Sequence, residues 1–278
     1  MNNHLATRPF LKWAGGKYRL LDKIKPVLPA AKRLIEPFAG AGAIALNTDY
    51  SSYWLNDLNH DLVNLYRQLQ QQQQQFINFA ATFFTAANND ERRYYQLRQH
   101  FNASNDPDER AALFLYLNRH SYNGLCRYNQ QGLFNAPFGR YPKPYFPKQQ
   151  LHAFAQRAKK IKFTQQTFEK VMQQATPNDV VYCDPPYVPL SNTANFTQYH
   201  QHNFTAKQQQ TLADLALELA KKRIPVIISN HNTALTRQLY RVAKLKKFTV
   251  PRLINCKGNQ RKPTKELIAI YGENLAAT

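Results

Sequence analysis

The chain of 278 residues is long enough for one or two domains with a sizeable hydrophobic core. Its 37 Lys and Arg against 17 Asp and Glu give a formal net charge of +20, more than solubility requires, which points to a polyanionic partner. Three scattered cysteines, no apolar leader and no apolar run of membrane-spanning length disfavour a zinc site, a disulfide framework and a membrane protein, so we expect a cytoplasmic protein.

The first motif in the chain is the stretch 10–17, Phe-Leu-Lys-Trp-Ala-Gly-Gly-Lys. Its two glycines allow a tight turn with close approach of a ligand to the backbone, although the spacing is not that of a phosphate-binding P-loop. Trp13 offers a ring for an adenine or a sugar, and Lys17 offers a charge for a carboxylate. The alternative is a loop that only covers the core. A short helix is expected over residues 18–27.

A strand over 34–38, a glycine-rich turn over 39–43 and a helix from 44 form the first unit of a nucleotide-binding α/β fold. Only Gly40 and Gly42 match the dinucleotide pattern, so a dinucleotide is not specifically indicated. The next strand, 53–56, ends in Asp57, which follows Gly40 by 17 positions. That spacing suits a carboxylate that accepts hydrogen bonds from the ribose hydroxyls of an adenosine.

Residues 59–147 have helical periodicity and no further strand–helix–strand unit, which predicts an inserted subdomain. A glutamine-rich run, 70–75, is expected to be an exposed helix end or a linker. A helix is predicted after Asp106, with proline at its first position, ending near His120. The insertion would divide a catalytic domain into residues 1–58 and 148–278.

The end of the insertion, residues 121–145, is aromatic, basic and rich in turn signals. We expect a hairpin or an ordered loop that fits a DNA groove, the alternative being a surface loop packed by its own aromatics. Arg127 is the candidate reader, because a guanidinium can donate two parallel hydrogen bonds to guanine O6 and N7. Leu125 lies two residues earlier, on the same side of an extended segment, and could touch a thymine methyl group.

The catalytic candidate is the tetrapeptide Asp184-Pro185-Pro186-Tyr187, which follows the apolar strand 180–183. The prolines force the backbone to turn, so a carboxylate, a carbonyl and a ring are held at a strand tip. Asp184 and the Pro185 carbonyl are acceptors, which suits an NH2 group with two hydrogens, and Tyr187 offers a stacking surface for a planar base. Accepting both hydrogens would free the lone pair of a conjugated amine. The alternative is a rigid turn without chemistry.

The remaining elements complete an α/β sheet. A helix begins at Thr205 in a capping box with Gln208, and strands are predicted over 225–230, 247–250 and 267–271. The basic loop 257–265 is expected either to face phosphates, through residues such as Lys257 and Arg261, or to be an ordinary solvated loop.

Six motifs in this order resemble those of the DNA adenine methylases of the Dam type, over nearly the whole chain. They are Phe10-Leu-Lys-Trp-Ala-Gly-Gly-Lys17, Glu36-Pro-Phe-Ala-Gly-Ala-Gly42, Leu115-Tyr-Leu-Asn-Arg119, Tyr122-Asn-Gly-Leu-Cys-Arg-Tyr128, Ala136-Pro-Phe-Gly-Arg-Tyr141 and Tyr182-Cys-Asp-Pro-Pro-Tyr187. The resemblance implies a Rossmann-like methyltransferase sheet with an inserted helical and β-hairpin DNA-recognition subdomain. It also implies S-adenosylmethionine as the methyl donor. The chain departs from the family at Asn56, where alanine is common, and in the loop near Asn259.

Carried over residue by residue, the resemblance assigns a donor site and a DNA surface. The donor site would contain Trp13, Lys17, Phe38, Gly40, Gly42, Asp57 and Asp184. On the DNA side, Lys12 would reach the first guanine of the site, Arg127 would read the outer guanine of the other strand, and Tyr122 would wedge into the base stack. Arg119 would contact a phosphate, and Leu125 and Pro137 would lie against thymine methyl groups. Asn123 and Tyr141 are the two further residues expected to contact DNA.

The sequence therefore predicts a monomeric, metal-independent enzyme that methylates adenine N6 in duplex GATC, with the target base flipped out of the helix. Two alternatives remain open at this stage. One is methylation of RNA adenine or of a protein amide, which also present an NH2 group. The other is a DNA-binding relative without activity.

Overall fold

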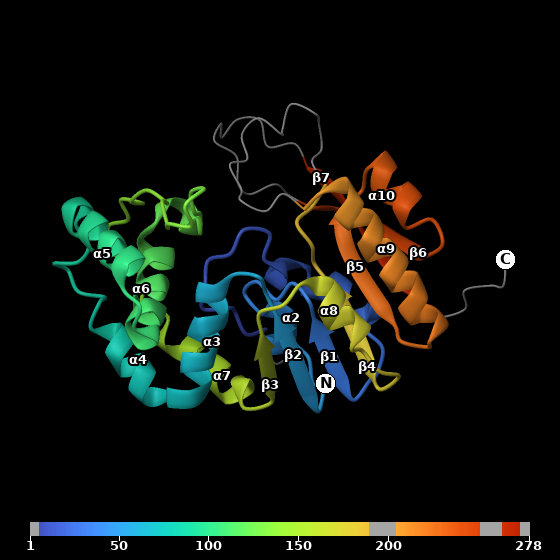
Figure 1. Ribbon diagram of the computed structural model, residues 1–278, viewed down its shortest axis with the longest axis horizontal. Coiled ribbons are helices and arrows are strands. Elements are labelled where there is room, and N and C mark those ends of the chain that lie inside the picture. Colours follow the sequence, from blue (N-terminus) through green and yellow to red (C-terminus); the bar gives the residue numbers. More distant parts are fainter. Residues whose placement is uncertain (1–5, 189–203, 251–262, 273–278) are drawn as a thin grey trace.

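The computed structural model describes residues 6–188, 204–250 and 263–272, and these form a seven-stranded sheet with helices on both faces (Figure 1). The strand order is β3-β2-β1-β4-β5-β7-β6. Five neighbouring strands are parallel, while β7 runs antiparallel to both β5 and β6. The bounds are β1 Arg33–Glu36, β2 Ser52–Asn56, β3 Ile161–Thr164, β4 Asp179–Cys183, β5 Val226–His231, β6 Lys244–Val250 and β7 Thr264–Tyr271.

The central strands are apolar throughout because both faces of the sheet are covered. Successive residues of a strand enter different cores: Leu34 packs with one and Ile35 with the other, as the alternation of side chains in a strand requires. The first core receives α1 (Leu21–Ile24), α2 (Ala43–Asn47) and α7 (Lys148–Ala158). The second receives α8 (Phe168–Gln173) and α9 (Ala206–Lys221), with α10 (Ala234–Leu239) packed beside α9.

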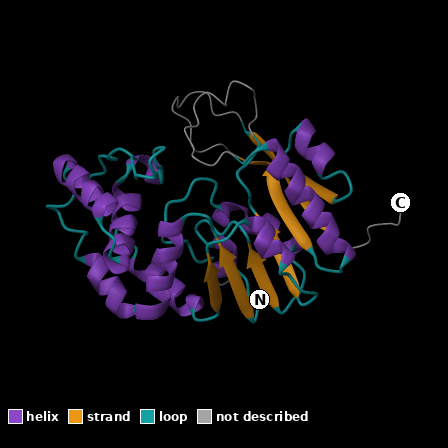
Figure 2. Ribbon diagram, in the orientation of Figure 1, coloured by secondary structure: helices purple, strands orange, loops and turns teal. Residues whose placement is uncertain are grey.

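A block of helices lies beside the β3 edge of the sheet (Figure 2). It consists of α3 (His60–Gln72), α4 (Gln74–Ala81), α5 (Glu91–Ala103) and α6 (Pro107–His120). Helix α6 is its centre, because every side chain from Ala111 to Asn118 is buried. Helix α3 contacts α6 on one side and α7 with β3 on the other, so it joins the block to the sheet.

The segment between α6 and α7 is an ordered loop (Figure 1). Instead of the continuous strands of a β-hairpin, residues 121–147 contain one 3-10 turn, η3 (Tyr122–Gly124), and two isolated bridges, Ser121–Phe138 and Tyr128–Phe134. Phe134 and Ala136 are buried against the helices, which fixes the loop to the block. An ordered aromatic loop, one of the two expected forms, is therefore what the structure contains.

Most sequence-predicted elements are present, with differences at their ends. The predicted helix 18–27 is a succession of short turns, η1 (Lys17–Leu20), α1 and η2 (Lys25–Val27). The glutamine run 70–75 spans the junction of α3 and α4, where Gln73 has a positive φ of 47°. The predicted capping box of Thr205 and Gln208 is confirmed. Lys257, Asn259 and Arg261 lie outside the described residues.

Within the described ranges, no helix is long and apolar enough to cross a bilayer. Over the same residues, no cluster of three or more His, Cys, Asp or Glu side chains is arranged to hold a metal ion.

Candidate active site

A large open cleft runs along the carboxyl ends of β1, β4 and β5 and reaches helix α6 and the loop that follows it. From β1 the chain adds β2 and β3 on one side and then returns to add β4 and β5 on the other, so the strand order reverses between β1 and β4. Open α/β sheets bind their ligands at such a point. The cleft has a volume of about 2370 Å³, well above the 300–1,000 Å³ usual for one small molecule. It has room for a small donor molecule and a piece of a larger substrate together.

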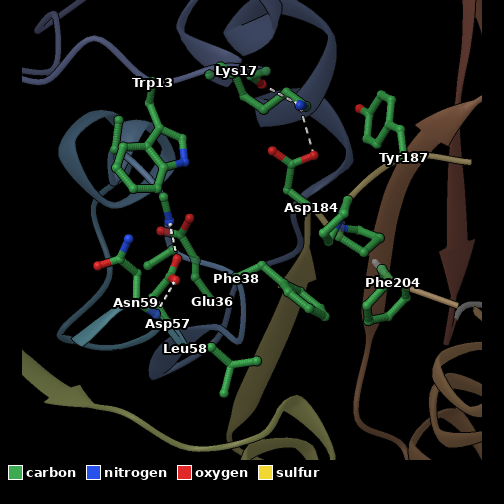
Figure 3. A pocket seen from close by; sticks show the side chains of 18 of the residues that line it. Trp13, Lys17, Glu36, Phe38, Asp57, Leu58, Asn59, Asp184, Tyr187 and Phe204 are labelled. Atoms are coloured by element: carbon green, nitrogen blue, oxygen red, sulfur yellow. Dashed lines mark hydrogen bonds and ion pairs between the residues drawn. The ribbon is translucent and has the colours of Figure 1, made fainter. Parts of the chain in front are cut away.

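Asp184 lies at the tip of β4, at the bottom of this cleft, and its side chain is 21% exposed. Its Oδ1 is 2.7 Å from the Lys17 ammonium and accepts a hydrogen bond from the Ser229 hydroxyl at 3.1 Å. Figure 3 shows its other oxygen directed into the open part of the cavity. Burial raises the pKa of Asp184, while Lys17 and Ser229 oppose that rise because both stabilise the carboxylate.

Tyr187 stands beside Asp184 and is held from three sides. Its hydroxyl donates to Glu266 Oε2 at 3.3 Å, and the His231 ring meets it edge-on with centroids 4.7 Å apart. The Lys17 ammonium lies 4.5 Å from the centroid of the Tyr187 ring. Burial raises the pKa of the Glu266 carboxyl, while the charge of Lys17 and the hydrogen bond from Tyr187 oppose that rise because both stabilise the carboxylate.

The turn between Asp184 and Tyr187 is anchored by the neighbouring elements. Pro185 is buried and lines the cleft, and the Pro186 carbonyl accepts a hydrogen bond of 2.9 Å from Gln209 on α9. The Val188 amide donates to Asn230 Oδ1 at 3.2 Å. Because α9 and β5 fix the turn, the Pro185 carbonyl and the Asp184 carboxylate keep one relative position.

A second wall of the cleft comes from the glycine-rich turn. Gly40 has φ +47°, and a Cβ there would lie 2.9 Å from the Trp13 ring, so only glycine lets the indole lie against the backbone. Asp57 holds the same turn, because its two oxygens accept 3.0 Å hydrogen bonds from the amides of Gly40 and Asn59. Gly42, with φ +66°, is the N-cap residue of α2. The predicted donor residues Trp13, Gly40 and Asp57 are thus brought together (Figure 3).

Aromatic rings line the floor of the cleft between these two walls. Phe38 is stacked on Phe168 with centroids 5.4 Å apart and meets Phe204 edge-on at 5.5 Å. Phe168 and Phe204 also touch, with centroids 5.3 Å apart, so the three rings form an apolar wall on which a planar heterocycle can lie. Glu36, buried at the tip of β1, accepts the Ala45 amide, and burial raises its pKa to about 8.

On the side of the helical block, Lys12 lines the cleft. Its ammonium donates to the Arg119 carbonyl at 3.3 Å and lies 3.8 Å from the Tyr141 ring centroid. Burial and the charge of Arg119 lower the pKa of Lys12 to about 8. The Tyr141 hydroxyl in turn accepts a 2.8 Å hydrogen bond from the Asn123 amide.

Arg127 has its guanidinium held by one neighbour. Its Nε donates to Asn135 Oδ1 at 2.8 Å and its Nη2 to the Asn135 carbonyl at 3.0 Å. The next residue, Tyr128, donates to Asp61 Oδ2 at 2.7 Å, which ties the loop to the start of α3. Tyr122 is 47% exposed, as a side chain that enters a base stack needs to be.

Most of the predicted site residues line this one cleft, namely Lys12, Trp13, Lys17, Phe38, Gly40, Asp57, Arg119, Arg127, Asp184, Pro185 and Tyr187. Gly42, Tyr122, Asn123, Leu125, Pro137 and Tyr141 are not among its lining residues. One placement differs from expectation: Lys17, expected to hold a donor's carboxylate, is paired with Asp184.

Sequence reasoning missed Glu36, Ser229, Glu266, Phe168 and Phe204. A signal existed for Glu36 and Ser229, because both are polar residues within predicted strands that are otherwise largely apolar. None existed for Glu266 or the two phenylalanines, because they reach the cleft only through strand pairing and helix packing.

The mixed sheet, with a glycine-rich turn, an aromatic wall and two acceptors at the point where the strand order reverses, fits a methyltransferase that acts on the amino group of a planar base. The family model for the D12 class N6 adenine-specific DNA methyltransferases matches residues 13–252. The chain therefore belongs to this family and is an adenine-specific DNA methyltransferase.

Curated relatives match along almost their whole length. A DNA adenine methylase of Escherichia coli (strain K12) is 52% identical over 264 residues, 95% of each chain. One of Salmonella typhi is 51% identical over 269 residues, 97% of each chain. One of Vibrio cholerae is 47% identical over 271 residues, 97% of this chain and 98% of the relative.

Proposed function

We propose that this enzyme methylates the N6 amine of the adenine in duplex GATC, that it uses S-adenosylmethionine, and that it works as a monomer on DNA in the cytoplasm. The location follows from a DNA substrate and from the bacterial relatives, which are named DNA adenine methylases.

The observation that carries the proposal is the corner formed by Asp184 and Tyr187. The Lys17 ammonium lies 2.7 Å from Asp184 Oδ1 and 4.5 Å from the Tyr187 ring, so this corner accepts an N–H donor beside an aromatic face. Adenine presents the same combination, an NH2 group on a planar ring. Because that amine is paired inside a duplex, the base has to leave the helix to reach the corner.

The residues of the corner then activate the amine. Asp184 and the Pro185 carbonyl accept the two N6 hydrogens, which draws the nitrogen towards tetrahedral geometry and makes its lone pair available. Tyr187 stacks on the base and holds it in line, so that positioning supplies much of the rate. Transfer would form the N–C bond and break the methyl–sulfur bond of the donor, with S-adenosylhomocysteine as the leaving group. The methylated nitrogen would be strongly acidic, and its surplus proton would pass through Asp184 or directly to water.

The other half of the cleft fits the donor. The apolar wall of Phe38, Phe168 and Phe204 suits one face of an adenine ring, and Asp57 suits the ribose hydroxyls, since each carboxylate oxygen has a second lone pair beside its amide contact. When bound, S-adenosylmethionine supplies a methyl group on a sulfonium. Trp13 would lie against the donor, and Lys17, which pairs with Asp184, would also hold the donor's carboxylate.

The test is protection of a GATC-containing plasmid. After incubation with the enzyme and S-adenosylmethionine, the plasmid should resist a nuclease blocked by N6-methyladenine in GATC and become sensitive to one that requires it. Labelled donor with RNA and with a protein amide substrate separates the alternatives. Label incorporated into either of these but not into DNA would refute the proposal.

A further inference from the structure

Asn118, near the end of α6, is fully buried and has no role in the chemistry described above. Its side chain clamps the backbone of Lys12, which is 106 residues away. Asn118 Oδ1 accepts from the Lys12 amide at 2.9 Å, and Asn118 Nδ2 donates to the Lys12 carbonyl at 2.7 Å. Because one bond accepts from the N–H and the other donates to the C=O of Lys12, the pair fixes both the distance and the orientation of the Lys12 backbone relative to α6.

The same amide also contacts the loop that carries Arg127. Asn118 Nδ2 lies 3.3 Å from the Gly124 carbonyl and 3.4 Å from Cys126 Sγ. Gly124 itself touches Lys12, because a Cβ added there would come 2.3 Å from Lys12 Cβ. Asn118 therefore joins two segments that are distant in sequence. At Gly124 these segments are so close that no side chain larger than that of glycine fits between them.

A further chain of contacts closes this junction on its outer side. The Lys12 ammonium lies over Tyr141, and the Tyr141 hydroxyl binds the amide of Asn123, next to Gly124. Asn118, Lys12, Tyr141 and the 123–124 peptide thus form a closed ring of contacts. Removing the Asn118 amide leaves the backbone N–H and C=O of Lys12 without these partners, and Asn118 is fully buried, so the loss is costly there, whereas the contact of Asn123 with Tyr141 is exposed.

We propose that Asn118 is a positioning residue for sequence recognition. It sets the spacing between Lys12 and the loop 121–128, so that the outer guanines of the two strands are read by one rigid unit. The inference rests on the proposed function and on the roles that the family resemblance implies for Lys12 and Arg127 in reading the two outer guanines. It adds to them a residue that touches no base. It predicts that loss of the clamp relaxes recognition at both outer base pairs of GATC together.

The test is kcat/KM on duplex oligonucleotides that each differ from GATC at one base pair. Asn118→Leu keeps the volume of the side chain and removes its hydrogen bonds to Lys12 and Gly124. We expect the preference for GATC over either outer-pair variant to fall at least tenfold, as good bidentate contacts are lost or misaligned. The preference over the inner-pair variants and the affinity for S-adenosylmethionine should change less than threefold.

Asn102→Leu is the matched control. Asn102 binds the backbone N–H and C=O of Phe134 in the same two-way manner, at 2.8 and 3.1 Å, and within the described ranges its side chain makes no hydrogen bond to Lys12. It should leave recognition of the outer pair read by Lys12 unchanged. Gly124→Ala strains the same junction from the opposite side and should reproduce the effect of Asn118→Leu, which provides the test if the latter does not fold.

The outcomes separate the two proposals. A wild-type enzyme that shows no preference for GATC at the outer pairs would refute the proposed function. A wild-type preference that Asn118→Leu and Gly124→Ala retain, or an equal fall for every duplex, would overturn only the role of Asn118. An equal loss at the Lys12 pair in Asn102→Leu would do the same.

Discussion

Replacing Asp184 by asparagine should be no milder than replacing it by alanine, although asparagine is nearly isosteric. The Lys17 ammonium and the Ser229 hydroxyl both donate to Oδ1, at 2.7 and 3.1 Å. An asparagine at this position has to present its carbonyl oxygen to those two donors. Its NH2 group then faces the cavity, where the N6 hydrogens of adenine need an acceptor.

The magnitude follows from the loss of one preorganised partner in a partly buried site. Removing a single hydrogen-bonding group that acts on developing charge costs about 2.7–4 kcal/mol, or about 10²–10³ in kcat. In Asp184→Asn a donor also opposes a donor, so we expect the upper end of that range. Asp184→Ala leaves the amine without an acceptor but adds no repulsion, so it should fall in the same range.

The assay is single-turnover methylation of a GATC duplex with saturating labelled S-adenosylmethionine, together with DNA binding measured by anisotropy. Both variants should bind GATC specifically, because no base-reading residue is altered. Clearly faster turnover by Asp184→Asn than by Asp184→Ala would refute the orientation argument. Turnover by Asp184→Ala above about a tenth of the wild-type rate would remove Asp184 from catalysis.

Three further predictions concern the donor, the DNA and the fold. Asp57→Ala should weaken S-adenosylmethionine binding by about 1.5–3 kcal/mol in calorimetry, because a charged acceptor for the ribose is lost, and an unchanged Kd in a folded variant would remove Asp57 from the donor site. Arg127→Ala should cost about 1–3 kcal/mol of discrimination at one guanine, whereas an equal loss on every duplex would make it a phosphate or structural residue. Burial raises the pKa of Glu36 to about 8 from an unfolded value of 4.5, so the folded state holds a proton that the unfolded state releases between these pH values. Stability should therefore fall as pH rises from about 5 to 8, by at most about 1.4 kcal/mol per pH unit from this group, and Glu36→Gln should flatten the curve of urea midpoints. Parallel curves for the two proteins would contradict the buried neutral carboxyl.

Local sequence was enough to predict the features that depend on neighbouring residues. The turn at Gly40 and Gly42, the turn at Asp184 and the capping box at Thr205 were all predictable, because backbone conformation there is set by residue type. Helix α6 was predictable as well, from the cap at Asp106 and the proline that follows it.

Only the tertiary structure decided which of these features meet. Lys17 and Asp184 are 167 positions apart, and they pair because β4 lies next to β1, an arrangement that no local pattern encodes. Glu266 reaches Tyr187 because β7 enters the sheet antiparallel to β5. Asn118 reads in the sequence as one more residue of a buried helix, and its clamp on Lys12 arises from packing between the two segments. The sequence therefore determined the local geometry of the motifs. Strand order and helix packing determined which side chains of different motifs contact each other, because contacts between distant segments depend on how the whole chain buries its apolar surface.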